Sequence, residues 1–227
     1  MNNLVTVYGG SGFIGRYIVQ KLARAGYRVR VATRRPNEAI FLKTYGMVGQ
    51  VEPVLCNIRN ESSIRNAMLG AEAVINCVGI LESVGKNKFA EVQYKGADFV
   101  SRIASELGVK KLVHISAIGA DINSKSKYAS SKAHGEASII KNFSNAVILR
   151  PSIVFGFEDK FFNRFASMAR LSPILPIVGG NTKFQPIHCS DLTDIIYHVI
   201  SKNIYSKIIE CTGPETIAFK ELLKKLL

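Results

Sequence analysis

Three glycines near the amino terminus have the spacing of a loop that holds a phosphate. Gly9, Gly12 and Gly15 follow the apolar run 4–8, and the residues after them have helical apolar spacing. The first glycine permits a tight turn, the second lets backbone approach a pyrophosphate, and the third lets the helix pack against the sheet. A turn with no chemical role would not need the strand before it and the helix after it. We therefore expect a nucleotide-binding loop, with the predicted members Gly9, Gly12, Phe13, Ile14 and Gly15.

Two arginines follow the second expected strand, where a nucleotide-binding site selects between cofactors. An NAD-preferring site usually has Asp or Glu at this point, for the ribose hydroxyls. This chain has Arg34 and Arg35 instead, and a guanidinium can bind a 2′-phosphate with two hydrogen bonds. The pair therefore predicts a preference for NADP(H), although NAD(H) is also possible. Arg34 is the first candidate for binding the 2′-phosphate and Arg35 is the second. A solvated charge pair without a ligand is the other interpretation.

Tyr128 and Lys132 have the types and spacing for proton transfer beside such a cofactor. Side chains four residues apart lie on one face of a helix. The lysine can lower the pKa of the phenol and hold the nicotinamide ribose, so that the tyrosine acts as a general acid or base. A second pair, Tyr17 and Lys21, has the same spacing but lies in the helix after the glycine loop, where we expect no substrate.

Strand-like and helix-like segments alternate along the first 150 residues, which predicts an α/β fold with a doubly wound parallel Rossmann sheet. The expected strands are 4–8, 28–33, 51–56, 73–77, 111–115 and 146–149, and the expected helices are 12–25, 64–69, 89–107, 130–142, 192–201 and 217–227. We expect one domain over 1–227, in which 151–227 forms a small, proline-punctuated lobe on the substrate side. The last helix has an apolar face that needs cover, either from missing chain or from another surface, and its members are Ile217, Leu222, Leu223 and Leu226.

The formal charge of +13 suits acidic partners such as phosphates, nucleic acid, anionic lipid or an acidic protein surface. A generic basic surface is the alternative. No apolar run reaches about 18 residues, so we expect no membrane-spanning helix. The four cysteines show no pairing pattern and the four histidines lie far apart. We therefore expect a reducing, cytoplasmic compartment and no metal.

The whole chain resembles short-chain dehydrogenases/reductases of the extended or atypical type. Asn57-Ile58 resembles the pair that contacts adenine, with Asn in place of Asp. Asn76–Gly79 is similar to the loop beside the cofactor, and Arg150–Gly156 to the segment that passes the nicotinamide. The resemblance implies further cofactor-binding residues, namely Asn57, Ile58, Val78, Gly79, Lys132, Pro151 and Ile153.

Four segments are similar to one branch of that superfamily, the dinucleotide-binding accessory subunits of respiratory complex I and their bacterial relatives. They are 41–50, 114–121, 124–128 and 155–161. In the mitochondrial members this resemblance implies tightly held NADPH with a mainly structural role. Because no transit peptide precedes the first strand, the chain resembles a bacterial relative. The implied setting is the inner face of the respiratory membrane, with a respiratory-complex or quinone-related protein as partner and peripheral membrane association left open.

One position departs from the catalytic members of the superfamily. They carry Ser or Thr two residues beyond the position of Ser116, where this chain has Ile118. An apolar side chain cannot hydrogen-bond a substrate carbonyl, so Ser116, Ser124 or Ser126 would have to substitute. The first hypothesis is accordingly a binding and assembly protein. The second is an active NADPH-dependent oxidoreductase, epimerase or dehydratase acting on a small carbonyl or nucleotide-sugar substrate. Nucleic acid is not an expected partner, because no RNA-recognition motif is present.

Overall fold

The computed structural model describes residues 3–171, 177 and 179–226, and its centre is a seven-stranded parallel sheet. The strand order is β10-β6-β5-β4-β1-β2-β3. Six of these strands were predicted, and their bounds are β1 (Leu4–Tyr8), β2 (Arg28–Thr33), β3 (Val51–Leu55), β4 (Ala73–Asn76), β5 (Lys111–Ile115) and β6 (Val147–Pro151). The order reverses between β1 and β4, which places a ligand crevice at their carboxyl ends.

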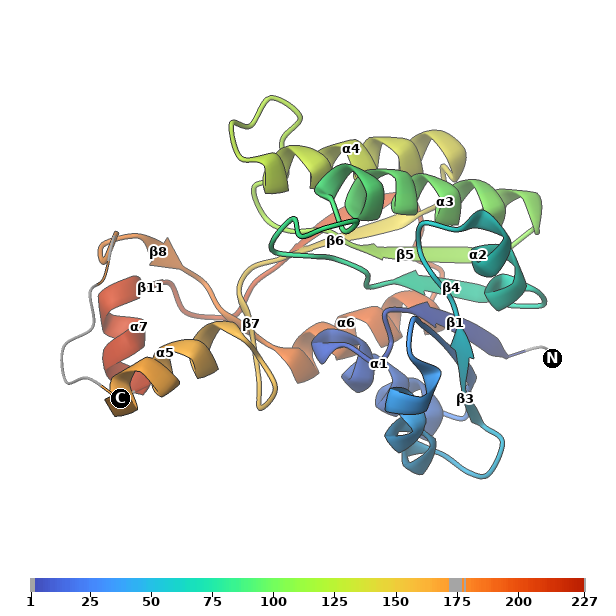
Figure 1. Ribbon diagram of the computed structural model, residues 1–227, viewed down its shortest axis with the longest axis horizontal. Coiled ribbons are helices and arrows are strands. Elements are labelled where there is room, and N and C mark those ends of the chain that lie inside the picture. Colours follow the sequence, from blue (N-terminus) through green and yellow to red (C-terminus); the bar gives the residue numbers. More distant parts are fainter. Residues whose placement is uncertain (1–2, 172–176, 178, 227) are drawn as a thin grey trace.

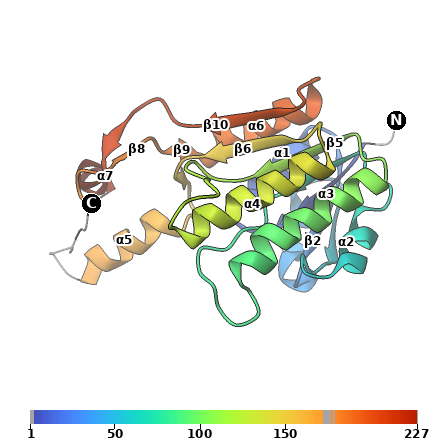
Figure 2. The same ribbon diagram turned by 90° about the horizontal axis from the view of Figure 1, so that it is seen from above.

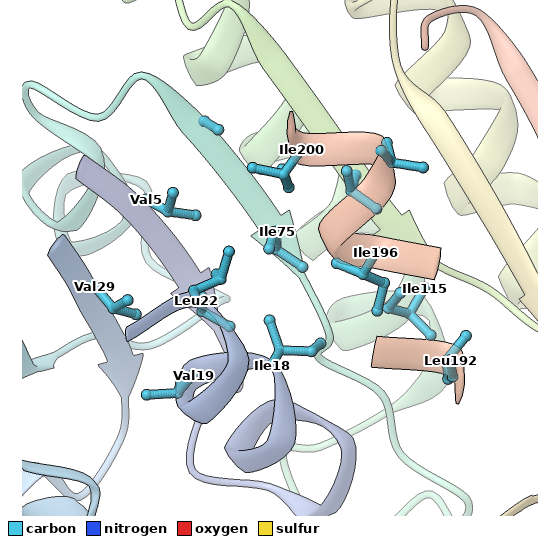
Figure 3. Packing of buried hydrophobic residues seen from close by; sticks show 14 of the residues in the cluster. Val5, Ile18, Val19, Leu22, Val29, Ile75, Ile115, Leu192, Ile196 and Ile200 are labelled. Carbon is cyan, nitrogen blue, oxygen red and sulfur yellow. The ribbon is translucent and has the colours of Figure 1, made fainter. Parts of the chain in front are cut away.

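Helices cover both faces of the sheet (Figure 1), which confirms the doubly wound fold. One face carries α2 (Glu61–Met68), α3 (Gly96–Glu106) and α4 (Lys127–Asn142). The other face carries α1 (Phe13–Arg24), α6 (Cys189–Ser201) and the 3₁₀ segment η1 (Pro36–Tyr45). Figure 3 shows Ile18 and Leu22 of α1 and Ile196 of α6 packed against side chains of the strands. Burial of the sheet on both faces accounts for the mostly apolar sequences of its central strands β1, β4 and β5.

Several elements differ from the prediction. β10 (Lys207–Cys211) pairs in parallel with β6 at the edge of the sheet, where no strand was expected. The expected helix 89–107 is a π-helical turn, η2 (Ala90–Lys95), followed by α3. Gly135 of α4 lies against this turn, since a Cβ at Gly135 would come 2.5 Å from the carbonyl oxygen of Gln93.

The lobe after β6 lies beyond the carboxyl ends of the central strands, as both views show (Figures 1 and 2). It contains α5 (Phe161–Leu171), which the prediction missed, and α7 (Phe219–Leu226). Two small sheets link them to the core. Their strands are β7 (Val154–Phe155) with β9 (Ile187–His188), and β8 (Lys183–Phe184) with β11 (Ile217–Ala218).

Aromatic rings from α5 and β8 cover part of the last helix. The ring of Phe219 lies 5.4 Å from that of Phe165 and 5.6 Å from that of Phe184, and Leu223 is buried. The expectation that Leu223 needs cover from outside this lobe is therefore wrong, and Ile217 belongs to β11 rather than to the helix. Ile217 and Leu222 instead line a cavity of about 310 Å³, together with Phe155, Phe162 and Pro186. None of the predicted site residues lines this cavity.

Two of the basic side chains that contribute to the net charge form hydrogen bonds within the fold. Arg30 donates to the carbonyl oxygens of Ala67 and Leu69, at the end of α2. Lys111 is buried, and its Nζ donates to the carbonyl oxygen of Val199 at 2.7 Å near the end of α6. Both cations stabilise the negative end of a helix dipole. They are therefore not part of a surface for acidic partners.

Candidate functional site

The glycine loop has the close contacts that its sequence predicts. Gly9 has φ +77°, a left-handed conformation that favours glycine. A Cβ at Gly15 would lie 2.2 Å from the carbonyl oxygen of Gly9, so α1 packs directly on the turn. A Cβ at Gly12 would meet only that same oxygen, at 3.2 Å, which leaves the backbone at the start of α1 open. The ring of Phe13 lies edge-on to that of Tyr17 in the same helix, and Ile14 packs against the core. The loop can therefore bind an anion through its backbone N–H groups.

Arg34 and Arg35 follow β2 but have different surroundings. Arg35 pairs with Glu38 at 3.0 Å on the surface. Arg34 is exposed, and its Nη1 donates to the Oδ1 of Asn87 at 3.5 Å. Because β2 and β4 flank β1, this contact between the chain after β2 and the chain after β4 spans the carboxyl end of β1. The Arg35 guanidinium is therefore engaged by Glu38, whereas the Arg34 guanidinium reaches toward the chain that follows β4.

Two hydroxyl groups near Arg34 escaped the sequence analysis. The Oγ of Ser11 lies 3.0 Å from the Oγ1 of Thr33, which connects the glycine loop to the end of β2. Hydroxyls and an arginine at one point form a donor set for a phosphate. Ser11 lies between Gly9 and Gly12, so its place in the glycine motif could have identified it from the sequence as a donor near the phosphate loop. The contact of Thr33 with Ser11 and that of Asn87 with Arg34 both depend on the order of the strands in the sheet, which the sequence alone does not give.

Asn57 and Ile58 lie just beyond β3, in the corner expected for adenine. Ile58 is buried against α3, since a Cβ at Gly96 would lie 2.8 Å from its Cγ1. The Oδ1 of Asn57 accepts hydrogen bonds from the backbone N–H of Arg59 at 3.1 Å and from its Nε at 3.4 Å. Arg59 also donates to the carbonyl oxygen of Lys86 at 3.0 Å. Asn57 therefore orients an arginine, which the sequence analysis did not include.

Val78 and Gly79 lie between the glycine loop and α4. The buried side chain of Asn76 accepts from the N–H of Val78 at 3.1 Å and holds this turn at the end of β4. The Cγ2 of Val78 would lie 3.2 Å from a Cβ at Gly9. A Cβ at Gly79 would lie 3.3 Å from the Nζ of Lys132. The structure therefore brings the glycine loop, this turn and the lysine into one continuous site.

Tyr128 and Lys132 lie in the first half of α4, whose start is capped by the hydroxyl of Ser126. Lys132 is buried, and its Nζ donates to the carbonyl oxygen of Ile115 at 2.9 Å. Burial lowers the pKa of its ammonium to about 8, against an opposing effect of Glu136. Tyr128 is partly buried, with its ring edge-on to Phe89 at 6.1 Å between centroids. Burial raises the pKa of the phenol, in the opposite direction to the lowering that the Tyr–Lys spacing predicts.

At the position where catalytic members of the superfamily carry Ser or Thr, this chain has Ile118. Ile118 is 41% exposed, and its N–H donates to the carbonyl oxygen of Pro151. Ser116 is buried at the end of β5, with no hydrogen-bond partner for its Oγ. Ser124 and Ser126 each accept a backbone N–H at the start of α4. These two serines are therefore engaged in local structure rather than free to replace the missing group.

Pro151 and Ile153 lie where β6 leaves the sheet toward the lobe. Pro151 is buried, and the carbonyl oxygen of Ile153 accepts from the N–H of Ile187, which joins this segment to β9. Tyr17 and Lys21, the second Tyr–Lys pair, are each bound to a carboxylate. The Tyr17 hydroxyl donates to Glu158 at 2.6 Å, and Lys21 pairs with Asp194 at 2.6 Å.

This combination of a doubly wound sheet, a glycine loop and a Tyr–Lys pair on the fourth helix agrees with the family comparison. A model of the NAD-dependent epimerase/dehydratase family matches residues 5–209. The chain therefore belongs to this family, which is part of the extended short-chain dehydrogenases/reductases. No helix in the described part of the chain is long and apolar enough to cross a membrane.

Named relatives place the chain near one branch of the superfamily. It is 33% identical over 226 residues to the NADH dehydrogenase [ubiquinone] 1 alpha subcomplex subunit 9 of Dictyostelium discoideum, with 99% of this chain and 63% of that protein covered. The corresponding subunit of Arabidopsis thaliana is 32% identical, with 96% of this chain and 56% of that protein covered. A ceramide reductase of Caulobacter vibrioides is 29% identical over 188 residues, covering 83% of this chain and 58% of that protein. The chain thus spans little more than half the length of these relatives.

Solved structures agree in fold. Pen from Bacillus thuringiensis superimposes with a TM-score of 0.87 at 18% identity, covering 99% of this chain and 72% of that one. A UDP-glucuronic acid 4-epimerase from Bacillus cereus, in complex with NAD and a substrate analogue, gives a TM-score of 0.83 at 20% identity, covering 98% of this chain and 82% of that one. The similarity to these two structures shows the fold alone.

The burial of Lys132 predicts a measurable effect on stability. In the folded protein the pKa is about 8, below the value of about 10.4 for an unfolded lysine. The unfolded state therefore binds more protons between these two values, so the contribution of Lys132 to stability rises with pH across that window. Lys132→Met removes this cost. We expect it to increase the free energy of unfolding at pH 7 by roughly 1–3 kcal/mol, less at pH 9.

Urea unfolding at pH 7, 8 and 9 measures the effect. Lys141→Met, at an exposed position of the same helix, is the control and should show no such pH dependence. A loss of stability in Lys132→Met that is equal at all three pH values would contradict the assignment of a costly buried ammonium.

Proposed function

We propose that this protein holds NADP(H) in the crevice above β1 and β4 and acts as an accessory or assembly component of a respiratory complex. The observation that carries the proposal is a glycine loop with the backbone needed to bind a phosphate, beside a Tyr128–Lys132 pair that lacks the third group, a Ser or Thr hydroxyl at position 118. The backbone at Gly12 is open, whereas the position of the expected hydroxyl is occupied by Ile118. Such a site retains a dinucleotide but lacks the group that would polarise a substrate carbonyl.

The proposed cofactor contacts follow the geometry around the crevice. The backbone of Gly9, Gly12, Phe13, Ile14 and Gly15 would bind the pyrophosphate, and Asn57 and Ile58 would border the adenine. Val78, Gly79, Pro151 and Ile153 would line the nicotinamide side, where Lys132 would hold the ribose. NADP(H) supplies a hydride donor or acceptor when bound. The preference for NADP(H) over NAD(H) rests on Arg34, with Ser11 and Thr33 as further donors to the 2′-phosphate.

The proposed partner is a respiratory complex or a quinone-related protein. The support is that relatives matching 96–99% of this chain are named as subunits of NADH-ubiquinone oxidoreductase. Peripheral association at the cytoplasmic face of the respiratory membrane is part of this proposal, and the charge of +13 suits an anionic surface.

An active NADPH-dependent oxidoreductase, epimerase or dehydratase is the second candidate. Two observations favour it. Tyr128 and Lys132 are both present at the site, and one relative is named a ceramide reductase. In this case Tyr128 would exchange a proton with the substrate and Lys132 would orient the ribose.

The cofactor preference is tested with Arg34. Wild-type protein should bind NADPH at least about tenfold more tightly than NADH, a difference of about 1.4 kcal/mol. Arg34→Ala should remove most of this difference because it removes the guanidinium beside the loop. Isothermal calorimetry measures all four affinities. Arg35→Ala removes the same charge from a side chain paired with Glu38 and is the matched control. Equal losses in both variants, or tighter binding of NADH by wild type, would refute the role of Arg34.

The two candidate functions are separated by Tyr128→Phe. For an accessory protein we expect no sustained NADPH oxidation by wild type with quinones, ketones or nucleotide sugars. Tyr128→Phe should bind NADPH as wild type does, since it removes only one oxygen. In an active enzyme the same change would lower the rate by about 10²-fold or more. Rapid turnover by wild type that Tyr128→Phe abolishes would replace the accessory role with the catalytic one.

A native gel of detergent-solubilised membranes gives an independent readout of the same question. An accessory component migrates with the NADH-oxidising respiratory complex, whereas a free reductase does not. Detection of the chain only in the unbound, low-mass fraction would argue against the accessory role even if no substrate is found.

A further inference from the structure

The segment between β4 and η2 contains a tight turn over residues 84–87, which we call the crevice turn. The backbone N–H of Val84 donates to the carbonyl oxygen of Asn87 at 3.1 Å, and the N–H of Asn87 donates to that of Val84 at 2.9 Å. Gly85 has φ +53°, in the left-handed region that favours glycine. The crevice turn therefore has a defined backbone conformation, although Val84 is 67% exposed.

The two ends of this segment are anchored near α4. The carbonyl oxygen of Ile80 accepts from the Nε2 of Gln93 at 2.6 Å, and Gln93 is buried. The Oγ of Ser83 accepts from the backbone N–H of Phe89 at 3.2 Å. The ring of Phe89 in turn lies edge-on to that of Tyr128. Both ends of the segment are thus held on the side of the site where Tyr128 lies.

Two arginines from the other side of the site hold the tip of the turn. The Nη1 of Arg59 donates to the carbonyl oxygen of Lys86 at 3.0 Å, and the Nη1 of Arg34 donates to the Oδ1 of Asn87 at 3.5 Å. The Nε of Arg59 also donates to the Oδ1 of Asn57 at 3.4 Å. The planar guanidinium of Arg59 therefore connects the end of β3 directly to the crevice turn.

The strand order places this connection across the crevice. β1 and β2 lie between β4 and β3 in the sheet, so the segment after β4 crosses the carboxyl ends of both strands to reach Arg59. The proposed dinucleotide takes the same course, from the glycine loop after β1 to Ile58 after β3. Residues 84–86 are exposed, so the crevice turn forms the solvent side of this path. The adenosine half of the cofactor would then lie between the turn and the strand ends.

We propose that Arg59 is a positioning residue that closes the crevice turn over the adenosine half of the bound dinucleotide and slows its release. The inference rests on the proposed function for its cofactor step, whereas the closed turn is a property of the protein alone. Release of the cofactor would require the turn to open, with loss of the Arg59 contact. Such a contact affects the dissociation rate more than the association rate.

The closed turn is tested by limited proteolysis of cofactor-free protein. Trypsin cleaves after Lys86 and Lys88, but only when the local backbone opens. Arg59→Ala should increase the rate of cleavage at these two bonds by about tenfold, since it removes a charged donor from the Lys86 carbonyl oxygen. Mass spectrometry identifies the bonds that are cut. Arg65→Ala removes an arginine that pairs with Glu106 instead, and should leave the rate unchanged.

The effect on the cofactor is tested by stopped-flow displacement of bound NADPH. Arg59→Ala should increase the dissociation rate about tenfold and change the association rate by less than about twofold. Arg59→Lys keeps the charge but not the planar fork that contacts Asn57 and Lys86 together, so it should resemble Arg59→Ala. Full rescue by lysine would mean that the charge, and not the closed turn, retains the cofactor, which would overturn the inference.

The outcomes separate this inference from the proposed function. An unchanged cleavage rate at Lys86 and Lys88 in folded Arg59→Ala overturns the inference, and so does an unchanged dissociation rate of NADPH. Tighter binding of NADPH by Arg59→Ala also overturns it, because the turn would then occupy the place of the adenosine. Wild-type protein that binds no NADPH refutes the proposed function, and the cleavage rates then decide alone whether Arg59 closes the turn. If Arg59→Ala does not fold, Arg59→Lys is measured in its place.

Discussion

The contact of Gly15 with the backbone of Gly9 is the constraint on which the site depends. Because no Cβ fits between them, α1 packs directly on the turn that follows β1. The first N–H groups of a helix have no partner within the helix, so this packing leaves them available at the carboxyl end of β1. The parallel sheet then determines what surrounds that point. β2 and β4 flank β1, so the segments after them, with Arg34 on one side and Gly79 on the other, border the glycine loop.

The part of the site near α4 contains the buried ammonium of Lys132, and burial of this charge lowers the stability of the fold. Lys132 is held under α4 by one carbonyl oxygen, and the nearby pair of Glu136 and Arg150 is itself partly removed from water. Replacement of buried charges by apolar side chains is often neutral or stabilising. Perturbed ionisable groups of this kind gather at functional sites. The residue two positions beyond Ser116, at the end of the neighbouring strand, is Ile118 rather than Ser or Thr.

Much of the fold follows from local pattern, and the exceptions have physical reasons. The central strands β1, β4 and β5 are short, mostly apolar and fully buried, as parallel strands covered on both faces require. β10 was missed because Lys207, Ile208 and Glu210 are exposed at the sheet edge, so its sequence lacks such a run. The lobe was recognised by its prolines, but α5 depends on contacts of its phenylalanines with Phe184 and Phe219, which are distant in sequence.

The site shows the same division between local and distant information. The spacing of motifs predicted the glycine loop and the position of Tyr128 and Lys132, because each of these two motifs lies within one short, continuous segment of the sequence. The partners of these residues come from other elements. Asn87 reaches Arg34 across β1, and Arg150 reaches Glu136 from β6. The lowered tyrosine pKa was wrong because burial, which spacing does not reveal, raises it.

Native mass spectrometry of the purified protein tests the central claim most directly. The account predicts a folded chain that retains one NADP(H), lost in Gly12→Val, where a branched side chain would occupy the open backbone at the start of α1. The same measurement reports whether NAD(H) is retained instead. A folded wild-type chain that carries no dinucleotide and acquires none from added NADPH or NADH would contradict the account.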